Sequence, residues 1–345
     1  RNLLPHLKKV APAVLTVGGW FDAEDLYGPL KIYRTVEKNN PNVFNVLCMG
    51  PWRHGGWSGG PGDKLGDIHF GSAAGEFYRK NIELPFFNYH LKDKGKLELP
   101  EAYVFETGNN RWRQFDAWPP KKTAAKKLYF RAGGKLSFEP PTEAEGYDEY
   151  LSDPAKPVPY STREVISMSA EYMVDDQRFA SRRPDVLVYQ TEPLKQDITL
   201  AGPLLADLRV STSGTDSDWV VKLIDVFPPG YKGSDGAALG HYQMMVRSEV
   251  IRGRFRDDPS KPKAFVPNQP TTVKLELQDV LHTFKKGHRI MFHVQSTWFP
   301  LVDRNPQKFV ENIYKADEKD FIKATQRVYR NATHPTSVEV GVLAD

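Results

Sequence analysis

Two stretches of the sequence decide the predicted fold: VGGWFDAEDLYG (Val17 to Gly28) and CMGPWRHGGWSGG (Cys48 to Gly60). The first begins near the end of the apolar run 12–19, and the second near the end of the apolar run 43–50. Short, continuous apolar runs are typical of strands that are buried on both faces of a parallel sheet. Asp22 and His54 therefore each follow the end of a predicted strand.

A helix is predicted between these two strands, because Leu26, Leu30, Tyr33 and Val36 recur at helical spacing. A second helix is predicted from about residue 72, with a kink or a break near Pro85. Strand, helix, strand, helix is the order of an α/β domain. Two strands are too few for a stable sheet that is covered on both faces, so we expect further strands from elsewhere.

Beyond residue 97 the pattern changes to short β-rich runs separated by turns that are rich in Gly, Pro, Asp and Ser. Val273, Leu275 and Leu277, for example, alternate with polar residues. Nine such runs, without a long amphipathic helix between them, favour a jelly-roll β-sandwich. The sequence therefore predicts an α/β domain over residues 1–97 and a jelly-roll domain over residues 98–345.

Composition excludes several classes of partner. The 345 residues carry 47 basic and 43 acidic side chains, a net charge of +4, so neither nucleic acid nor an anionic membrane is expected as a partner. No apolar run approaches the roughly 18 residues of a membrane span. The single cysteine excludes an internal disulfide and a multi-cysteine metal site. The spacing of His282, His288 and His293 matches no common zinc signature, so we expect no metal and no cofactor.

Asp22 and His54 form a candidate catalytic pair. Ligands and catalytic groups of α/β enzymes gather beyond the carboxyl ends of the strands, where both residues are predicted to lie. A carboxylate that accepts the Nδ1 proton of an imidazole orients the ring as a general base. The simpler alternatives are that Asp22 caps the next helix and that His54 belongs to an ordinary surface loop. The nearby aromatic residues Trp20, Phe21 and Trp57 could line a substrate pocket or simply pack.

One serine matches a nucleophile motif, because Gly56 to Gly60 has the form G-x-S-x-G. The motif functions only where a strand directly precedes the serine and a helix directly follows it. Ser58 instead lies within a predicted loop, four residues after His54. The usual chain order is serine, acid, histidine, and Ser58 comes last. We therefore predict that Ser58 is not the nucleophile.

GGWFDAEDLYG and MGPWRHGGW resemble the acid and histidine segments of α-amino-acid ester hydrolases and glutaryl-cephalosporin acylases, within the wider group of cocaine esterase and the X-Pro dipeptidyl-peptidases. The segment 274–306 resembles the last part of that group's jelly roll. The resemblance implies that Asp22 is the acid and His54 the base of a catalytic triad. It also implies the C-terminal part of an α/β-hydrolase domain followed by a jelly roll.

The family's serine lies far upstream of the acid, whereas 21 residues precede Asp22 here. We expect the nucleophile and its oxyanion hole on an N-terminal portion of the same enzyme, and little activity from this chain alone. The implied substrates are small esters or amides: α-amino-acid esters, glutaryl or other acyl amides, or X-Pro peptides. The resemblance favours a periplasmic or secreted bacterial enzyme, and we also expect a homo-oligomer.

Two other functions are compatible with the sequence. A non-catalytic β-sandwich module that binds carbohydrate or protein would explain the β-rich region. Such a module has no need for an acid and a histidine at successive strand ends. A complete enzyme that uses Ser58 in an unusual geometry would predict that Ser58→Ala abolishes activity without loss of stability.

Overall fold

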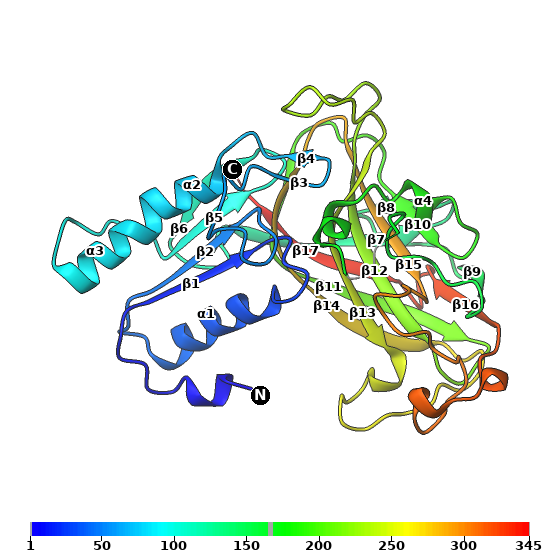
Figure 1. Cartoon of the computed structure of the whole chain (residues 1–345). Coiled ribbons are helices and arrows are strands. Elements are labelled where there is room, and N and C mark those ends of the chain that lie inside the picture. The colour runs from blue at the N-terminus through cyan, green and yellow to red at the C-terminus, as the bar shows by residue number, and fades with distance from the viewer. Residues whose placement is uncertain (1, 165–167, 345) are drawn as a thin grey trace.

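The computed structural model describes residues 2–164 and 168–344, which form a mostly β structure with few helices. The strands are arranged in a four-stranded sheet, an eleven-stranded sheet and one short hairpin. Figure 1 shows the four-stranded sheet with its helices on one side of the molecule and the eleven-stranded sheet on the other.

The four-stranded sheet has the order β1-β2-β5-β6. Strands β1 (Val14–Gly19) and β2 (Asn45–Gly50) are parallel, with Val17 opposite Cys48. Helix α1 (Tyr27–Asn39) connects them and buries Leu30, Tyr33 and Val36. All six residues of β2 are buried, which explains the unbroken apolar run in the sequence. Both strands and the connecting helix lie where the sequence predicts them.

The remaining two strands of this sheet come from beyond residue 97. Strand β5 (Ala102–Glu106) is parallel to β2, and β6 (Arg111–Phe115) is antiparallel to β5. Every β-rich run beyond residue 97 is expected in the jelly roll, and for β5 this expectation is wrong, because β5 pairs with β2. A short apolar run predicts a strand without indicating which strand it will pair with. The predicted domain boundary at residue 97 itself stays a prediction.

One continuous helical segment follows the loop that contains His54 (Figure 1). It consists of α2 (Ala74–Tyr78), the π-helical segment η2 (Arg79–Glu83) and α3 (Leu84–Lys92). The disturbance predicted near Pro85 takes the form of this wider π-helical turn. Pro85 has no N–H to donate to the carbonyl of Asn81, and a π-helical turn absorbs such a local interruption of the α-helical pattern.

The eleven-stranded sheet has the order β13-β12-β15-β10-β8-β7-β17-β11-β16-β9, with β14 paired to β11. Its strands are β7 (Thr123–Arg131), β8 (Lys135–Ser137), β9 (Tyr147–Ser152), β10 (Leu187–Gln190), β11 (Ile198–Thr212), β12 (Asp218–Val226), β13 (Gln243–Arg252), β14 (Thr271–Phe284), β15 (Arg289–Gln295), β16 (Ala324–Tyr329) and β17 (Ser337–Leu343). The hairpin is β3 (Lys64–Leu65) with β4 (Ile68–His69).

Short helical turns occupy some of the connections. They are η1 (Leu4–His6), η3 (Ala170–Val174), α4 (Arg178–Ser181), η4 (Gly253–Phe255), η5 (Ile313–Lys315) and η6 (Glu318–Asp320). None of these helices, nor any other in residues 2–164 and 168–344, is long and apolar enough to cross a bilayer.

Strand β12 shows how the two sheets join. Trp219, Val221 and Leu223 belong to the core enclosed by the eleven-stranded sheet. Val220, on the opposite face, belongs to a second apolar cluster that also contains Trp20 and Phe105 from the region of the four-stranded sheet. β12 is therefore packed on both faces, and eight of its nine residues are buried.

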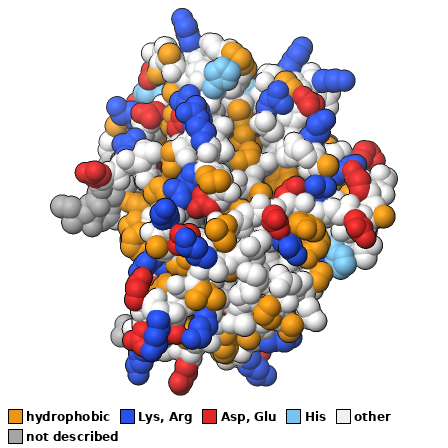
Figure 2. All heavy atoms as spheres, turned by 90° about the vertical axis from the view of Figure 1, so that its right-hand side faces the viewer, with side chains coloured by type: hydrophobic (Ala, Val, Ile, Leu, Met, Phe, Trp, Pro, Cys, Tyr) orange, Lys and Arg blue, Asp and Glu red, His pale blue; other side chains and the backbone are white. Residues whose placement is uncertain are grey.

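The outer face of the β-rich region carries charges of both signs. Figure 2 shows Lys and Arg side chains interspersed with Asp and Glu side chains over this face, without one large patch of a single sign. The small net charge of +4 is consistent with that distribution.

Candidate active site

The ends of β1 and β2 bring two loops together. We call residues 20–26 the acid loop and residues 51–62 the histidine loop. The N–H of Trp20 donates to the carbonyl of Gly50 at 2.8 Å, and the N–H of Phe21 donates to the carbonyl of Trp52 at 3.0 Å. Gly19 allows this close approach, because a Cβ there would lie 2.2 Å from the carbonyl oxygen of Trp52. Asp22 and His54 are consequently held on adjacent loops at the carboxyl ends of parallel strands.

His54 Nδ1 lies 3.0 Å from Asp22 Oδ2 and 3.2 Å from Asp22 Oδ1. The Asp22 side chain is 2% exposed, whereas the His54 side chain is 53% exposed. Within the described residues, no hydrogen bond to His54 Nε2 is found. The imidazole is therefore held from one side and open on the other, which is the arrangement that a general base requires.

Asp22 is held in place by its own backbone neighbours. Its Oδ1 accepts hydrogen bonds from the N–H groups of Glu24 and Asp25, at 3.0 and 2.9 Å. Asp22 therefore closes a tight turn, and it does not cap α1, whose N-cap residue is Leu26. Two backbone donors and the His54 ring satisfy a carboxylate that would otherwise be buried at considerable cost.

The carboxylate raises the pKa of His54 above its ordinary value of 6.5, mainly through the hydrogen bond from the imidazole to Asp22 and then through Asp22's charge. The negative charges of Glu24 and Asp25 act in the same direction. A hydrogen-bonded anion stabilises the imidazolium, so the ring becomes a stronger base. Glu24 and Asp25 are not among the site residues predicted from the sequence, although both follow Asp22 within three positions.

Ser58 lies where the sequence analysis places it. It stands in a bend of the histidine loop, exposed, and its Oγ donates to the carbonyl of Gly55 at 2.8 Å. Neither a strand before it nor a helix after it gives the turn that the G-x-S-x-G motif requires. Ser58 therefore matches the motif in sequence but lacks the local structure that makes such a serine a nucleophile.

Two of the three aromatic residues that were predicted to contact substrate are packed in the protein interior. Trp20 and Phe21 are each 1% exposed. The Trp20 Nε1–H donates to the carbonyl of Phe105 at 2.8 Å, and the Phe21 ring stacks on Phe70. Trp57 is half-buried and lies against Trp52. Contact with substrate stays a prediction for Trp57 and loses support for the two buried residues.

A pocket of about 260 Å³ lies beside the acid loop. The acid loop and the start of α1 form one wall, and the β-rich region forms the other, including Leu301 and Val302. The loop at 300–303 thus reaches the pocket from the β-rich region. The lining residues are Asp22, Ala23, Glu24, Leu26, Tyr27, Tyr172, Met173, Ser248, Glu249, Val250, Gln278, Trp298, Leu301 and Val302.

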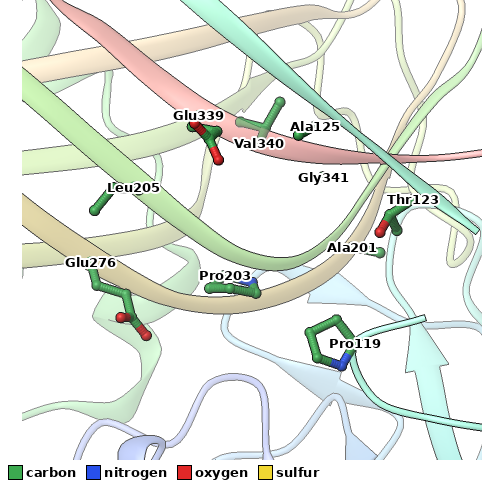
Figure 3. Close-up of a pocket in the computed structure, with 10 residues that line it drawn as sticks. All are labelled: Pro119, Thr123, Ala125, Ala201, Pro203, Leu205, Glu276, Glu339, Val340 and Gly341. Atoms are coloured by element: carbon green, nitrogen blue, oxygen red, sulfur yellow. The ribbon is translucent and has the colours of Figure 1, made fainter. Parts of the chain in front are cut away.

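A second pocket, of about 370 Å³, lies on the β-rich region, where its lining residues come from β7, β11, β14, β17 and the segment before β7 (Figure 3). Glu276 and Glu339 are its only charged residues, and the rest of the lining is mostly aliphatic. It contains neither Asp22 nor His54 and offers no imidazole. Of these two pockets, only the first is lined by a member of the acid–base pair, Asp22.

Among residues 2–164 and 168–344, no group of three or more His, Cys, Asp or Glu side chains is arranged to hold a metal ion. Within the same residues, His282 and His288 both bond to the buried carboxylate of Asp225, at 3.1 and 2.9 Å. These two histidines are thus engaged in a structural network between strands.

Comparison with known proteins gives matches over both parts of the chain. The family described as the X-Pro dipeptidyl-peptidase C-terminal non-catalytic domain matches residues 94–339. This chain belongs to the cocaine esterase and X-Pro dipeptidyl-peptidase group. The X-Pro dipeptidyl-peptidase S15 family also matches residues 1–56, the part that contains the acid and histidine loops.

Several members of the group are similar over nearly the whole chain. An aminopeptidase from a marine sediment archaeon of the Thaumarchaeota is 43% identical, with a TM-score of 0.92 over 98% of this chain and 56% of its own. An α-amino acid ester hydrolase is 40% identical, with a TM-score of 0.93 over 99% of this chain and 57% of its own. Cocaine esterase from Rhodococcus is 29% identical over 99% of this chain and 58% of its own. The chain thus spans somewhat more than half the length of these relatives.

Proposed function

We propose that the complete protein is a serine hydrolase of esters or amides in which Asp22 is the triad acid and His54 the general base. One observation carries the proposal: His54 Nδ1 is bound to a buried carboxylate while its Nε2 is left open. Asp22 accepts the Nδ1 proton and so fixes the tautomer in which Nε2 can accept a proton. The relatives are named as an aminopeptidase, an α-amino acid ester hydrolase and a cocaine esterase, and these names support this class of reaction.

The nucleophile is a serine that we place on an upstream portion of the protein. Its hydroxyl proton passes to His54 Nε2 as the oxygen attacks the carbonyl carbon of the substrate. The imidazolium then donates that proton to the departing alcohol or amine, leaving an acyl-enzyme. A water molecule then attacks the acyl carbon and passes a proton to His54 Nε2. The imidazolium returns that proton to the serine oxygen as the bond to the acyl group breaks, which releases the acid and regenerates the serine. Asp22 stabilises the imidazolium in both steps and stays ionised.

We also propose the fold that this mechanism needs. The sheet β1-β2-β5-β6 is the C-terminal part of an α/β-hydrolase sheet, and the eleven-stranded sheet forms a jelly-roll domain. Within the described residues β1 pairs only with β2, so its other edge is available to a strand of the upstream portion. The family matches at 1–56 and 94–339 support a division near residue 97. A homo-oligomer stays a prediction.

For the substrate, we propose an ester or amide that carries a free α-amino group. Glu24 and Asp25 place negative charge close enough to affect the His54 imidazole, and both are exposed. A cationic group on the substrate would be attracted to the same charges. Two relatives with 40% or greater identity are named as an aminopeptidase and an α-amino acid ester hydrolase, which supports the same class.

The alternative of a pure binding module has one observation in its favour, since the family that matches residues 94–339 is described as non-catalytic. Asp22 and His54 lie outside that range, in the part matched by the peptidase family. A binding role would therefore concern the β-rich region and would leave the acid–histidine pair unexplained.

The test measures kcat/KM of the complete protein for the p-nitrophenyl ester of an α-amino acid and for its N-acetylated form. We expect a preference for the free amine, a reduced preference in Glu24→Gln, and a loss of roughly 10³-fold or more with His54→Ala. His69→Ala is the matched control, because His69 lies nearby and pairs with Asp63 at 3.4 Å. Full activity of His54→Ala would overturn the proposal.

A further inference from the structure

The acid loop is held at both ends by the β-rich region. The first contact is a buried arginine, Arg247 of β13, which is 2% exposed. One terminal nitrogen of its guanidinium donates to the carbonyl of Trp20 at 2.7 Å, 227 residues away in the chain. Trp20 stands two positions before Asp22, so this hydrogen bond fixes the entry of the acid loop.

The second contact is Asp279 of β14, which is fully buried. Its carboxylate forms an ion pair with Arg34 of α1, the helix that directly follows the acid loop. Trp118 donates to the same carboxylate oxygen at 2.7 Å. This contact fixes the exit of the acid loop through the helix that continues it.

The two contacts are joined to each other. Arg247 Nε donates to the backbone carbonyl of Asp279 at 3.1 Å. The guanidinium also lies over the Trp20 ring, 5.8 Å from its centroid. Burial lowers the pKa of Arg247 to about 10, so the side chain stays charged at neutral pH and its bonds remain charge-assisted.

We propose that Arg247 and Asp279 act as a clamp, meaning the two positioning residues through which the β-rich region sets the geometry of Asp22 toward His54. The region matched by a family described as a non-catalytic domain would then contribute to catalysis without touching the substrate. The inference rests on the proposed function for its catalytic consequence. Its structural part, the effect of the clamp on the Asp22–His54 hydrogen bond, can be measured without any substrate.

The physical reason is that a general base loses efficiency steeply when its orientation changes. A displacement of about 1 Å can cost roughly 100-fold in rate. The acid loop is anchored on its other side by the backbone bonds of Trp20 and Phe21 to β2 and the histidine loop. Releasing the clamp would leave those bonds and the turn that Asp22 closes with Glu24 and Asp25, and would allow the acid loop as a whole to shift relative to the imidazole.

The test is an NMR titration of the His54 imidazole in the complete protein labelled with [13C]histidine, the resonance being assigned with His54→Gln. We expect Arg247→Met to lower the His54 pKa toward its ordinary value, because the hydrogen bond to Asp22 is the largest cause of its increase. Arg34→Met releases the other end of the loop and should act in the same direction. The unfolding temperature is measured beside the titration, because the change leaves the buried Asp279 carboxylate without its ion-pair partner. Arg247→Lys, which keeps a charge, should lower the pKa less than Arg247→Met.

The matched controls separate positioning from general stability. Arg254 is also a buried arginine of the β-rich region, bound to Asp216 and to the carbonyl of Val310, but it has no contact with the acid loop. Arg254→Met should lower the unfolding temperature and leave the His54 pKa unchanged. Lys38→Met, at an exposed position of α1, should change neither.

Activity gives the second readout. We expect kcat of Arg247→Met and Arg34→Met to fall by roughly 10-fold to 100-fold with little change in KM. An unchanged His54 pKa in both folded variants would overturn the clamp. Failure of the proposed function would show as full activity of His54→Ala. In that case the NMR titration would still test whether Arg247 and Asp279 position Asp22.

Discussion

Residue type and position predict that Asp22 and His54 lie close together, but they do not predict how the neighbouring aromatic residues are buried. Both follow strand ends, and the carboxyl ends of parallel strands share one edge of a sheet, so their proximity follows from the pattern. The burial of Trp20 and Phe21 does not follow from it. Aromatic residues after a strand pack inward or face a cleft depending on what covers them. Here the cover comes from Met244, Met245 and other residues far along the chain.

Asp22→Asn in the complete protein tests the acid at this scale. The change removes the charge that raises the His54 pKa, so the acid limb of the pH profile of kcat/KM should move to lower pH. The rate itself should fall by roughly 10⁴-fold, because an amide cannot hold the productive tautomer. Asp63→Asn, the partner of His69, should leave both unchanged. An acid limb that stays in place in Asp22→Asn would contradict the pairing.

At the scale of elements, the strands were easier to predict than their partners. β12 and β14 are visible in the sequence as long runs of β-forming residues, whereas the pairing of β5 with β2 is not, since any neighbouring edge would satisfy its backbone. Of the strands beyond residue 97, β6, β8, β9 and β16 lie outside the nine predicted runs. β16 alternates buried and half-buried positions with Thr, Gln and Arg among them, so its hydrophobic signal is weak.

Gly19 at the end of β1 gives a prediction for the crossing of the two loops. Gly19→Ala would place a methyl group 2.2 Å from the carbonyl oxygen of Trp52, so the loops must separate. We expect a loss of roughly 1–3 kcal/mol in stability and at least a 10-fold loss in kcat. Gly59→Ala, where nothing lies within 4 Å of the added atom, is the control measured beside it by denaturant unfolding and assay. Equal behaviour of the two variants would count against the close approach.

Lys222 in β12 gives a prediction for pH-dependent stability. Its ammonium is fully buried, donates to Gln177 at 2.9 Å and has its pKa lowered by burial to about 7. Between that value and the ordinary value of roughly 10.4, the unfolded chain binds the proton that the folded chain lacks, so stability rises with pH across this window. The neighbouring His293 has a pKa lowered mainly by burial and stays neutral there.

Lys222→Met removes this titration. The free energy of unfolding of the variant, minus that of the unaltered chain, should be greater at pH 7 than at pH 10 by on the order of 3 kcal/mol. Urea unfolding at both pH values measures the difference. Lys274→Met, at an exposed position of β14, should show no such dependence. The same stability difference at both pH values would show that Lys222 keeps an ordinary pKa.

At the scale of the whole molecule, the two sheets are joined through one apolar cluster and through polar contacts that sequence cannot reveal. The bond from Arg247 to Trp20 spans 227 residues, and the ion pair from Arg34 to Asp279 spans 245. Neither residue type nor local spacing indicates such a partner. The order of an α/β segment followed by β-rich strands was predictable, whereas the way in which the second part holds the first was not.

We propose that Asp22 and His54 serve a serine on the upstream portion of the protein. Labelling of the complete protein with a fluorophosphonate, followed by peptide mapping, tests it directly. We expect one labelled serine, upstream of the acid loop, with labelling lost in His54→Ala and retained in Ser58→Ala. Label on Ser58, or labelling that is indifferent to His54→Ala, would contradict it.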